Sequence, residues 1–267
     1  MKLGLFVIDP QNDFCSQTGS LFVPGADKDM ERLSAMVARL GSKLKSIFVT
    51  MDSHHIFDVA HPSFWVDRNL DHPQPYTIIS VDDVISGTWR TSIPTLGKWA
   101  EEYVKGLASK GRFPLCIWPE HCIIGSSGNN IYPQLFNSLC EWEKTPGNFV
   151  QYQTKGSNFK TEHYSVFEAE YPDPSDPSTQ FNSLFANAIN SCDKVLIAGE
   201  ARTHCVINSL RSLIEYMGED FIRKMIFIED ASSNVTAIPD LVIAADNYFA
   251  DLKNKGMEVT TTDSFLI

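Results

Sequence analysis

The sequence predicts an α/β protein with a mainly parallel sheet that is covered by helices on both faces. Two observations lead to this fold class. Short apolar runs without polar alternation recur along the 267 residues, as is typical of strands that are buried on both faces. Longer segments of helical period separate these runs, so that consecutive strands are joined by helices and lie parallel.

The expected elements alternate along the chain. Runs that are rich in β-branched and aromatic residues predict strands at 3–9, 46–52, 113–118, 148–154, 194–200 and 224–230. Apolar residues at helical spacing predict helices at 26–44, 95–109, 129–143, 179–191, 204–217 and 238–251.

Two stretches interrupt this alternation. Residues 66–94 are punctuated by proline and aspartate and hold a candidate strand at YTIISV (76–81), so we interpret them as an insertion. Residues 170–178, EYPDPSDPS, carry too much proline for a helix or a strand. Neither stretch has the character of a domain linker. We therefore expect one domain over residues 1–267, with an insertion at about 66–94.

The composition excludes several kinds of partner. The formal net charge is −11 and the acidic residues are spread along the chain, which argues against binding to nucleic acid or to an anionic membrane. No apolar stretch reaches the ~18 residues of a membrane-spanning helix. The apolar N-terminal run lacks a signal-peptide cleavage site and is interpreted as the first strand. Six cysteines without CxxC or framework spacing predict reduced thiols and a cytoplasmic location.

Residues with functional side chains stand at the carboxyl ends of the expected strands. They are Asp9, Asp52, Trp118, Lys155 and Glu200. Taken singly, Asp9 is a common turn or helix-cap residue and Lys155 a common surface lysine. Taken together, they predict a site, because ligands bind beyond the carboxyl ends of the strands in open parallel sheets.

Cys205 lies in GEARTHCVINSL, between a polar turn and the expected start of a helix. A thiolate there is stabilised by the positive end of the helix, and neighbouring backbone N–H groups can hold an oxyanion. The alternative is a small apolar residue at the first core-facing position of that helix. The Gly/Ala-containing turn favours the nucleophile. His204 is not expected to be its base, because adjacent side chains on a helix do not face each other.

A histidine cluster follows the second expected strand. MDSHHIFDVAHPSFW places Asp52, His54, His55 and His61 within ten residues, and WPEHC adds His121. Positions i and i+2 of an extended segment share a face, so Asp52 and His54 can point to the same side. A carboxylate with imidazoles suits zinc, iron or manganese. Any one of these histidines alone is better explained as a turn residue.

These motifs together resemble the nicotinamidase/pyrazinamidase branch of the isochorismatase-like cysteine hydrolases. IDPQNDFCSQTGSLFVPGA resembles the opening motif of the family, DSHHIFDVAHPSF its metal-binding segment, and WPEHCIIGSSG the motif that follows. TKG matches the lysine motif, GEARTHCV the nucleophile turn and EDASS a later segment, so the resemblance runs from residue 3 to about 235. It implies a three-layer α/β/α fold around a six-stranded, mainly parallel sheet.

The resemblance also implies the roles of individual residues. The catalytic triad would be Asp9, Lys155 and Cys205, and the backbone amides of Ala201 and Cys205 would form the oxyanion hole. The peptide bond Glu200–Ala201 would be cis. The metal ligands would be Asp52, His54 and His121, with His61 as a fourth ligand. Phe14 and Trp118 would lie on either side of the pyridine ring of the substrate. Glu200 and the long insertion depart from the family pattern.

The implied function is that of a metal-assisted cysteine amidohydrolase. It would convert nicotinamide and water into nicotinate and ammonia through a thioester on Cys205, as part of NAD salvage. We expect one divalent metal ion, with zinc as the first choice and iron or manganese as alternatives. The sequence leaves open whether the chain forms a homo-oligomer. Three alternatives remain: a relative that acts on a linear amide, carbamoyl or ureido substrate, a non-catalytic domain that binds a partner through 66–94, and a zinc hydrolase in which Cys205 is structural.

Overall fold

The centre of the fold is a six-stranded parallel sheet with the strand order β10-β9-β8-β1-β2-β7. The computed structural model describes residues 1–237 and 239–266. The strands of this sheet are β1 (Leu3–Ile8), β2 (Leu44–Asp52), β7 (Val150–Lys155), β8 (Lys194–Gly199), β9 (Met225–Ile228) and β10 (Glu258–Thr260). Every side chain of the central strand β1 is buried, which explains its continuous apolar run.

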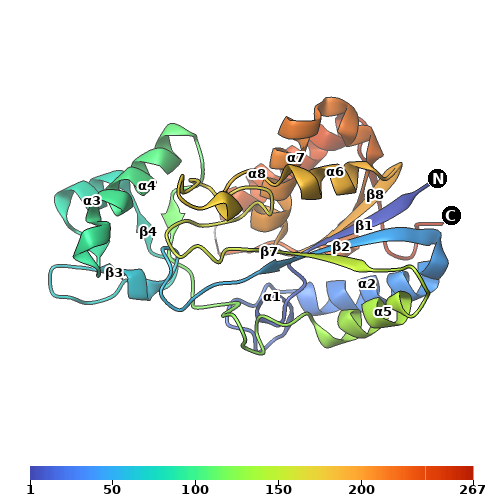
Figure 1. The fold of residues 1–267 in the computed structure, drawn as a ribbon, viewed down its shortest axis with the longest axis horizontal. Coiled ribbons are helices and arrows are strands. Elements are labelled where there is room, and N and C mark those ends of the chain that lie inside the picture. Colours follow the sequence, from blue (N-terminus) through green and yellow to red (C-terminus); the bar gives the residue numbers. More distant parts are fainter. Residues whose placement is uncertain (238, 267) are drawn as a thin grey trace.

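Helices cover both faces of the sheet, so the predicted three-layer fold is confirmed (Figure 1). One face carries α2 (Ala26–Leu40) and α5 (Pro133–Glu143), and the other carries α6 (Ser183–Asn190), α7 (Ile207–Met217) and α8 (Pro239–Asn254). The predicted helix 26–44 ends at Leu40 because Gly41 takes a positive φ of 50°. The predicted helix 129–143 begins only at Pro133, since proline is favoured in the first turn of a helix.

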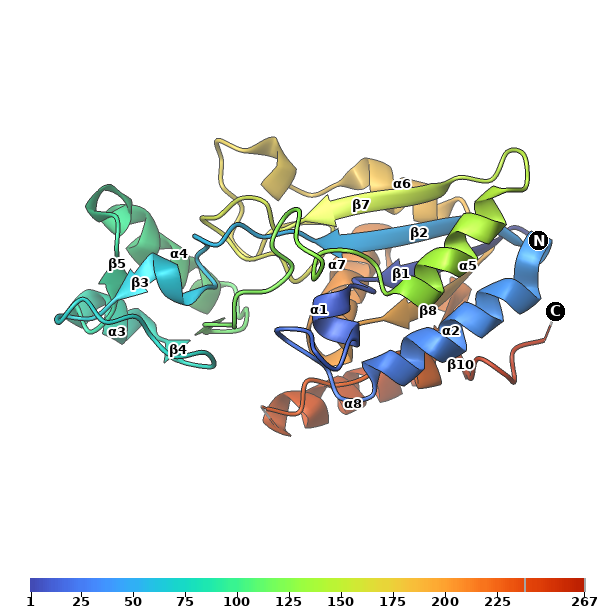
Figure 2. The same cartoon turned by 90° about the horizontal axis from the view of Figure 1, so that it is seen from below.

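A lobe made of residues between β2 and α5 projects beyond the carboxyl ends of β2 and β7, opposite both termini (Figure 2). It contains β3 (Trp65–Val66), β4 (Ile78–Ile79), α3 (Val81–Ser86), β5 (Arg90–Thr91), α4 (Gly97–Ser109) and β6 (Leu115–Cys116). The strands pair antiparallel as β3 with β5 and β4 with β6. The predicted insertion 66–94 thus forms part of this lobe.

Two strand predictions need correction. The strand predicted at 113–118 is β6, which covers two residues and pairs with β4 outside the central sheet. The sixth strand of the sheet is instead β10, whose three residues are exposed or partly exposed and lack an apolar run. The strand predicted at 76–81 covers only Ile78–Ile79, because Ser80 caps α3 through reciprocal hydrogen bonds with Asp83.

Shorter elements complete the description. The four-residue helix α1 (Asn12–Cys15) follows β1. Short 3₁₀ turns lie at Gly41–Lys43, Pro62–Phe64, Pro94–Leu96, Pro177–Thr179, Glu219–Lys224 and Glu229–Ala231. Among the described residues, no helix combines the length and the apolar character that crossing a membrane requires.

Candidate active site

Lys155 is the centre of a buried polar cluster at the carboxyl ends of the strands. Its Nζ lies 3.0 Å from Asp9 Oδ2 and 3.0 Å from Asp52 Oδ1. The same Nζ lies 3.6 Å from Cys205 Sγ and donates a 2.8 Å hydrogen bond to the His163 carbonyl. The sheet register explains this meeting, because Asp52 and Lys155 are paired residues of β2 and β7. Of the five predicted strand-end residues, Asp9, Asp52 and Lys155 therefore lie in contact.

The surroundings in this cluster shift the pKa values of its two carboxylates, Asp9 and Asp52, in opposite directions. Burial disfavours the charge of Lys155, but Asp52 and Asp9 outweigh it and hold the pKa of the lysine well above its usual value. Burial alone would raise the pKa of Asp52, yet His54 and Lys155 hold it well below the usual range. Burial raises the pKa of Asp9, with Lys155 opposing. The surroundings therefore favour the ionised form of Asp52 more strongly than that of Asp9.

Asp9 is held by two hydrogen bonds to Thr50, a buried residue of β2. The Asp9 backbone N–H donates to Thr50 Oγ1 at 2.9 Å, and the Thr50 hydroxyl donates to Asp9 Oδ1 at 2.5 Å. Asp9 has a φ of 44°, an uncommon conformation for a residue with a side chain. This backbone turn at the end of β1 points the other carboxylate oxygen at Lys155.

Cys205 lies in a π-helical turn, Arg202–Val206, between β8 and α7. Burial raises the pKa of its thiol well above the usual value, with Lys155 opposing. These surroundings favour the neutral thiol over the thiolate. The predicted cis peptide Glu200–Ala201 is present. Gly199 precedes it at φ 112°, where a Cβ atom would lie 2.0 Å from the Ile8 carbonyl oxygen, so only glycine fits.

The Glu200 side chain is hydrogen-bonded to the segment around Ser233. Its side chain is fully buried and accepts a 2.9 Å hydrogen bond from the backbone N–H of Ser233. Burial and the neighbouring Asp29 raise the pKa of the Glu200 carboxyl well above its usual range. This carboxyl ties the turn before Cys205 to the segment around Ser233, and the Ser233 carbonyl also accepts a hydrogen bond from the Arg202 N–H.

Asp52, His54 and His121 form a compact set of buried metal-ligand atoms, all within 4.8 Å of one another. The Nε2 atoms of His54 and His121 lie 3.1 and 3.6 Å from Asp52 Oδ2. The opposite Nδ1 atoms are engaged, by Asp58 Oδ2 at 3.1 Å and by the Pro119 carbonyl at 2.8 Å. Outer partners of this kind orient metal-binding histidines. The residues present therefore fit a divalent transition-metal ion.

His61 lies beside this set but is not part of it. Its Nε2 is 3.3 Å from Nδ1 of His121, and its own Nδ1 faces the His55 carbonyl at 3.1 Å. Burial and the His121 ring lower the pKa of His61 to about 2, so it is a neutral ring in contact with a candidate ligand. Its role as a fourth ligand stays a prediction.

Aromatic side chains enclose a narrow cavity in front of Cys205. Phe14 and Trp118 both line it, together with Leu21, Asp52, His121, Glu162, Tyr164, Ala201, His204 and Val235. Trp118 reaches the cavity from the lobe instead of from a strand of the central sheet, and its Nε1 donates a 3.0 Å hydrogen bond to the Tyr164 hydroxyl. We name this space the inner cavity; its volume is about 30 Å³.

Glu162 and Tyr164 are cavity residues that the sequence analysis missed. Glu162 Oε1 lies 4.0 Å from His54 Nε2, and the same carboxylate accepts a hydrogen bond from the His163 N–H. Burial raises the pKa of Glu162, with His54 opposing. Both residues lie in irregular backbone after β7, and no expected strand or helix drew attention to them.

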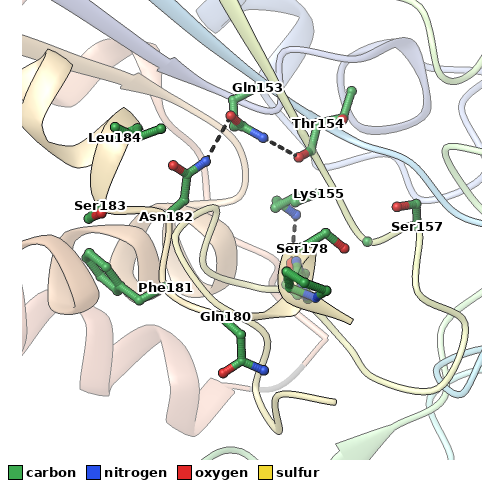
Figure 3. Close-up of a pocket in the computed structure, with 13 residues that line it drawn as sticks. Gln153, Thr154, Lys155, Ser157, Ser178, Gln180, Phe181, Asn182, Ser183 and Leu184 are labelled. Atoms are coloured by element: carbon green, nitrogen blue, oxygen red, sulfur yellow. Dashed lines mark hydrogen bonds between the residues drawn. The ribbon is translucent and has the colours of Figure 1, made fainter. Parts of the chain in front are cut away.

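A larger hollow lies next to Lys155, which is one of its lining residues (Figure 3). Its volume is about 400 Å³, and it is lined mainly by amides and hydroxyls of residues 153–157 and 177–184. Asn182 donates to Gln153 across it at 3.0 Å. Cys205 does not line it, so the reactive space is the smaller inner cavity.

Comparisons with known proteins support the resemblance. No family model matches the chain. It is similar to the nicotinamidase of Saccharomyces cerevisiae, with 25% identity over 202 residues that cover 76% of each chain. It is also similar to the nicotinamidase of Escherichia coli, with 21% identity over 202 residues, 76% of this chain and 71% of that protein.

Solved structures show the same fold. A nicotinamidase/pyrazinamidase of Acinetobacter baumanii superposes with a TM-score of 0.65 at 18% identity, covering 99% of this chain and 98% of its own. A yeast nicotinamidase bound to the inhibitor nicotinaldehyde superposes with a TM-score of 0.66 at 19% identity, covering 97% of this chain and 99% of its own. A pyrazinamidase of Pyrococcus horikoshii in complex with zinc superposes with a TM-score of 0.54 at 17% identity, covering 98% of this chain and 99% of its own. The predicted resemblance and the predicted fold are both confirmed.

Proposed function

We propose that this chain is a metal-assisted cysteine amidohydrolase that converts nicotinamide and water into nicotinate and ammonia. The observation that carries the proposal is the single buried ammonium of Lys155 in contact with Asp9, Asp52 and Cys205. A base, a thiol and a cation are thereby brought together next to a set of metal ligands. The similarity to two nicotinamidases supports an amide of a pyridine ring as the substrate.

The first half of the reaction forms a thioester. The Asp9 carboxylate takes the proton of the Cys205 thiol, and Lys155 stabilises the resulting thiolate. The thiolate sulfur bonds to the amide carbon, and the carbonyl oxygen becomes an oxyanion that faces the backbone amides of Ala201 and Cys205. Asp9 then returns its proton to the amide nitrogen, the C–N bond breaks and ammonia leaves.

The second half hydrolyses the thioester. Asp9, again ionised, takes a proton from a water molecule as its oxygen bonds to the thioester carbon. The C–S bond then breaks, the proton on Asp9 returns to the Cys205 sulfur and nicotinate is released. One water is consumed, and the cysteine and the aspartate return to their starting states.

Asp52, His54 and His121 would hold one divalent ion, for which zinc is our first assignment. Bound there, the ion would supply Lewis acidity to the atom that it holds. Lys155 neutralises the second oxygen of Asp52 and so orients that carboxylate, while Asp58 orients His54. Phe14 and Trp118 would position the flat ring of the substrate.

The test is ammonia release from nicotinamide by the metal-loaded protein, with Cys205→Ala beside it. Loss of the nucleophile should reduce turnover by at least about 1,000-fold while the metal content of the protein stays the same. Cys140→Ala is the matched control, because this cysteine lies on α5, away from the site. Full activity in Cys205→Ala would favour a zinc hydrolase with a structural cysteine.

The same assay separates the remaining alternatives. Turnover of linear amides or ureido compounds without turnover of nicotinamide would assign another amidohydrolase. Inertness toward all amides after metal loading would favour a non-catalytic domain that binds a partner through the insertion 66–94. We further infer a cytoplasmic enzyme of NAD salvage, in keeping with the free cysteines and the net charge of −11.

A further inference from the structure

A second pocket lies directly behind one wall of the inner cavity. It has a volume of about 280 Å³, and we name it the outer pocket. Trp118, Tyr164 and His204 line both spaces. The outer pocket is otherwise formed by the lobe and by the start of α8, with Tyr76, Ile78 and Phe113 as its main apolar side chains.

The shared wall is a layer of aromatic rings. The His204 ring meets Trp118 edge-on at 5.2 Å between centroids and lies 5.5 Å from the Tyr164 ring. Trp118 and Tyr164 are joined to each other by a hydrogen bond. The His204 side chain has one hydrogen-bond contact, 2.9 Å between Nδ1 and Thr203 Oγ1. The His204 ring is therefore one of three packed rings that separate the inner cavity from the outer pocket.

The volumes show on which side the shared wall has room to move. The inner cavity of about 30 Å³ has room for about two water molecules, which is less than a pyridine ring requires. A ring that reaches Cys205 must push a wall aside. Behind the His204 wall there are about 280 Å³ of space, so displacement in that direction joins the two volumes.

The outer pocket is built for an apolar group. None of the side chains that line it among the described residues is acidic or basic, apart from the His204 imidazole. A charged substituent would lose its hydration there without gaining a partner. Tyr76 has a φ of 69°, which is rare for a bulky residue, and its ring stands at 86° to Trp118 at 5.9 Å. Tyr76 and Ile78 remain 47% and 44% exposed, as expected of contacts that await a ligand.

We propose that the outer pocket is a specificity subsite that takes an apolar substituent on the ring of the amide substrate. The preferred substrates are then ring-substituted aromatic amides, with nicotinamide the smallest member of the class. This proposal rests on the proposed function for the nature of the amide, but the pocket itself can be tested by binding alone.

The experiment is a calorimetric titration of the metal-loaded Cys205→Ala variant, which binds the amide without cleaving it. The ligands are nicotinamide and its derivatives with a propyl group at ring carbon 2, 4, 5 or 6. At least one propyl isomer should bind about 10- to 50-fold more tightly than nicotinamide, because three methylene-sized groups leave water. The corresponding propionate derivative should gain no affinity. Failure of every propyl isomer to exceed nicotinamide would overturn the proposal.

Two substitutions locate the effect in the outer pocket. Ile78→Ser should reduce the ratio of propyl to nicotinamide affinity about 3- to 10-fold. Ile85→Ser is the matched control, since Ile85 is 59% exposed on α3 of the same lobe and does not line the pocket; it should leave the ratio unchanged. Equal ratios in the two variants would overturn the assignment. If the wild type fails to hydrolyse nicotinamide but the ratio still depends on Ile78, the proposed function fails and the subsite stands.

Discussion

Replacing Thr50 with valine tests whether Asp9 is the proton carrier. The substitution keeps the shape of a fully buried side chain and removes its hydroxyl. Two hydrogen bonds are lost: the one from the Thr50 hydroxyl to Asp9 Oδ1 and the one from the Asp9 N–H to Thr50 Oγ1. The first stabilises the ionised carboxylate, and the second satisfies a buried backbone donor.

The magnitude follows from these two bonds. A hydrogen bond to a charged group contributes about 1.5 to 3 kcal/mol, and an unpaired buried donor costs about 1 to 3 kcal/mol. Because such contributions do not add fully, we expect a loss of about 3 kcal/mol in the free energy of unfolding. In the native protein the hydrogen bond from the Thr50 hydroxyl lowers the pKa of Asp9. Without it that pKa rises, so the base stays protonated to higher pH.

The assay combines urea unfolding with the pH dependence of kcat/KM for nicotinamide. In Thr50→Val the acid limb of the profile should move to higher pH, and kcat/KM on that limb should fall about tenfold, equivalent to about 1.4 kcal/mol. Thr50→Ser is the control: it keeps the hydroxyl and loses one methyl group, which costs about 1 kcal/mol of stability. If valine destabilises the fold but leaves the acid limb in place, Asp9 is not the base.

Three further predictions concern the surroundings of the site. Asp58→Asn should weaken metal binding about 10- to 100-fold in a chelator competition, because the carboxylate that orients His54 is lost; unchanged affinity would remove Asp58 from the metal site. Burial raises the pKa of the Glu170 carboxyl from 4.5 to about 7. The folded state therefore holds the proton more tightly than the unfolded state, and the free energy of unfolding falls as pH rises from 4.5 to about 7. Glu170→Gln should remove about 3 kcal/mol of that pH dependence, measured by unfolding at pH 5 and pH 8; a persisting slope would assign it to other groups. Gly156→Ala should lower metal affinity as well as stability, because its Cβ atom would lie 2.7 Å from Oδ1 of the proposed ligand Asp52. Gly147→Ala is the control, because Gly147 has a similar positive φ but open space where the Cβ atom would lie; this variant should lose only about 1 kcal/mol of stability. Equal metal affinities in Gly156→Ala and Gly147→Ala would contradict the predicted clash.

The sequence predicted the site best where it lies on the central sheet. Asp9, Asp52 and Lys155 follow adjacent strands, β1, β2 and β7, and parallel strands end at a common edge. Their meeting is thus a consequence of strand order and needs no detailed knowledge of the loops. The same reasoning misplaced Trp118, whose short strand pairs with the insertion instead of joining the sheet.

The contributions from the lobe could not be predicted in this way. His121 reaches His54 because the two segments pair along their backbones: the His54 N–H donates to the Cys122 carbonyl at 3.0 Å, and Ile124 donates back to His54 at 3.0 Å. Neither segment has the length or apolar pattern of a strand. Glu162 lies in irregular backbone after β7, where periodicity gives no guidance. Long-range pairing of irregular segments leaves no local signal in the sequence.

The contrast between Asp9 and Asp52 explains how one lysine serves two different carboxylates. Both lie 3.0 Å from Lys155 Nζ, so the distance to the lysine does not distinguish them. Asp52 also lies beside the imidazoles of His54 and His121, which hold its pKa well below the usual value and keep it available as a metal ligand. Asp9 has only the lysine and a hydroxyl against its burial, so its pKa is raised. Environments that push two acids apart in this way are typical of sites in which one carboxylate keeps its charge and the other carries a proton, and this difference supports our proposal that Asp52 holds the metal and Asp9 transfers the proton.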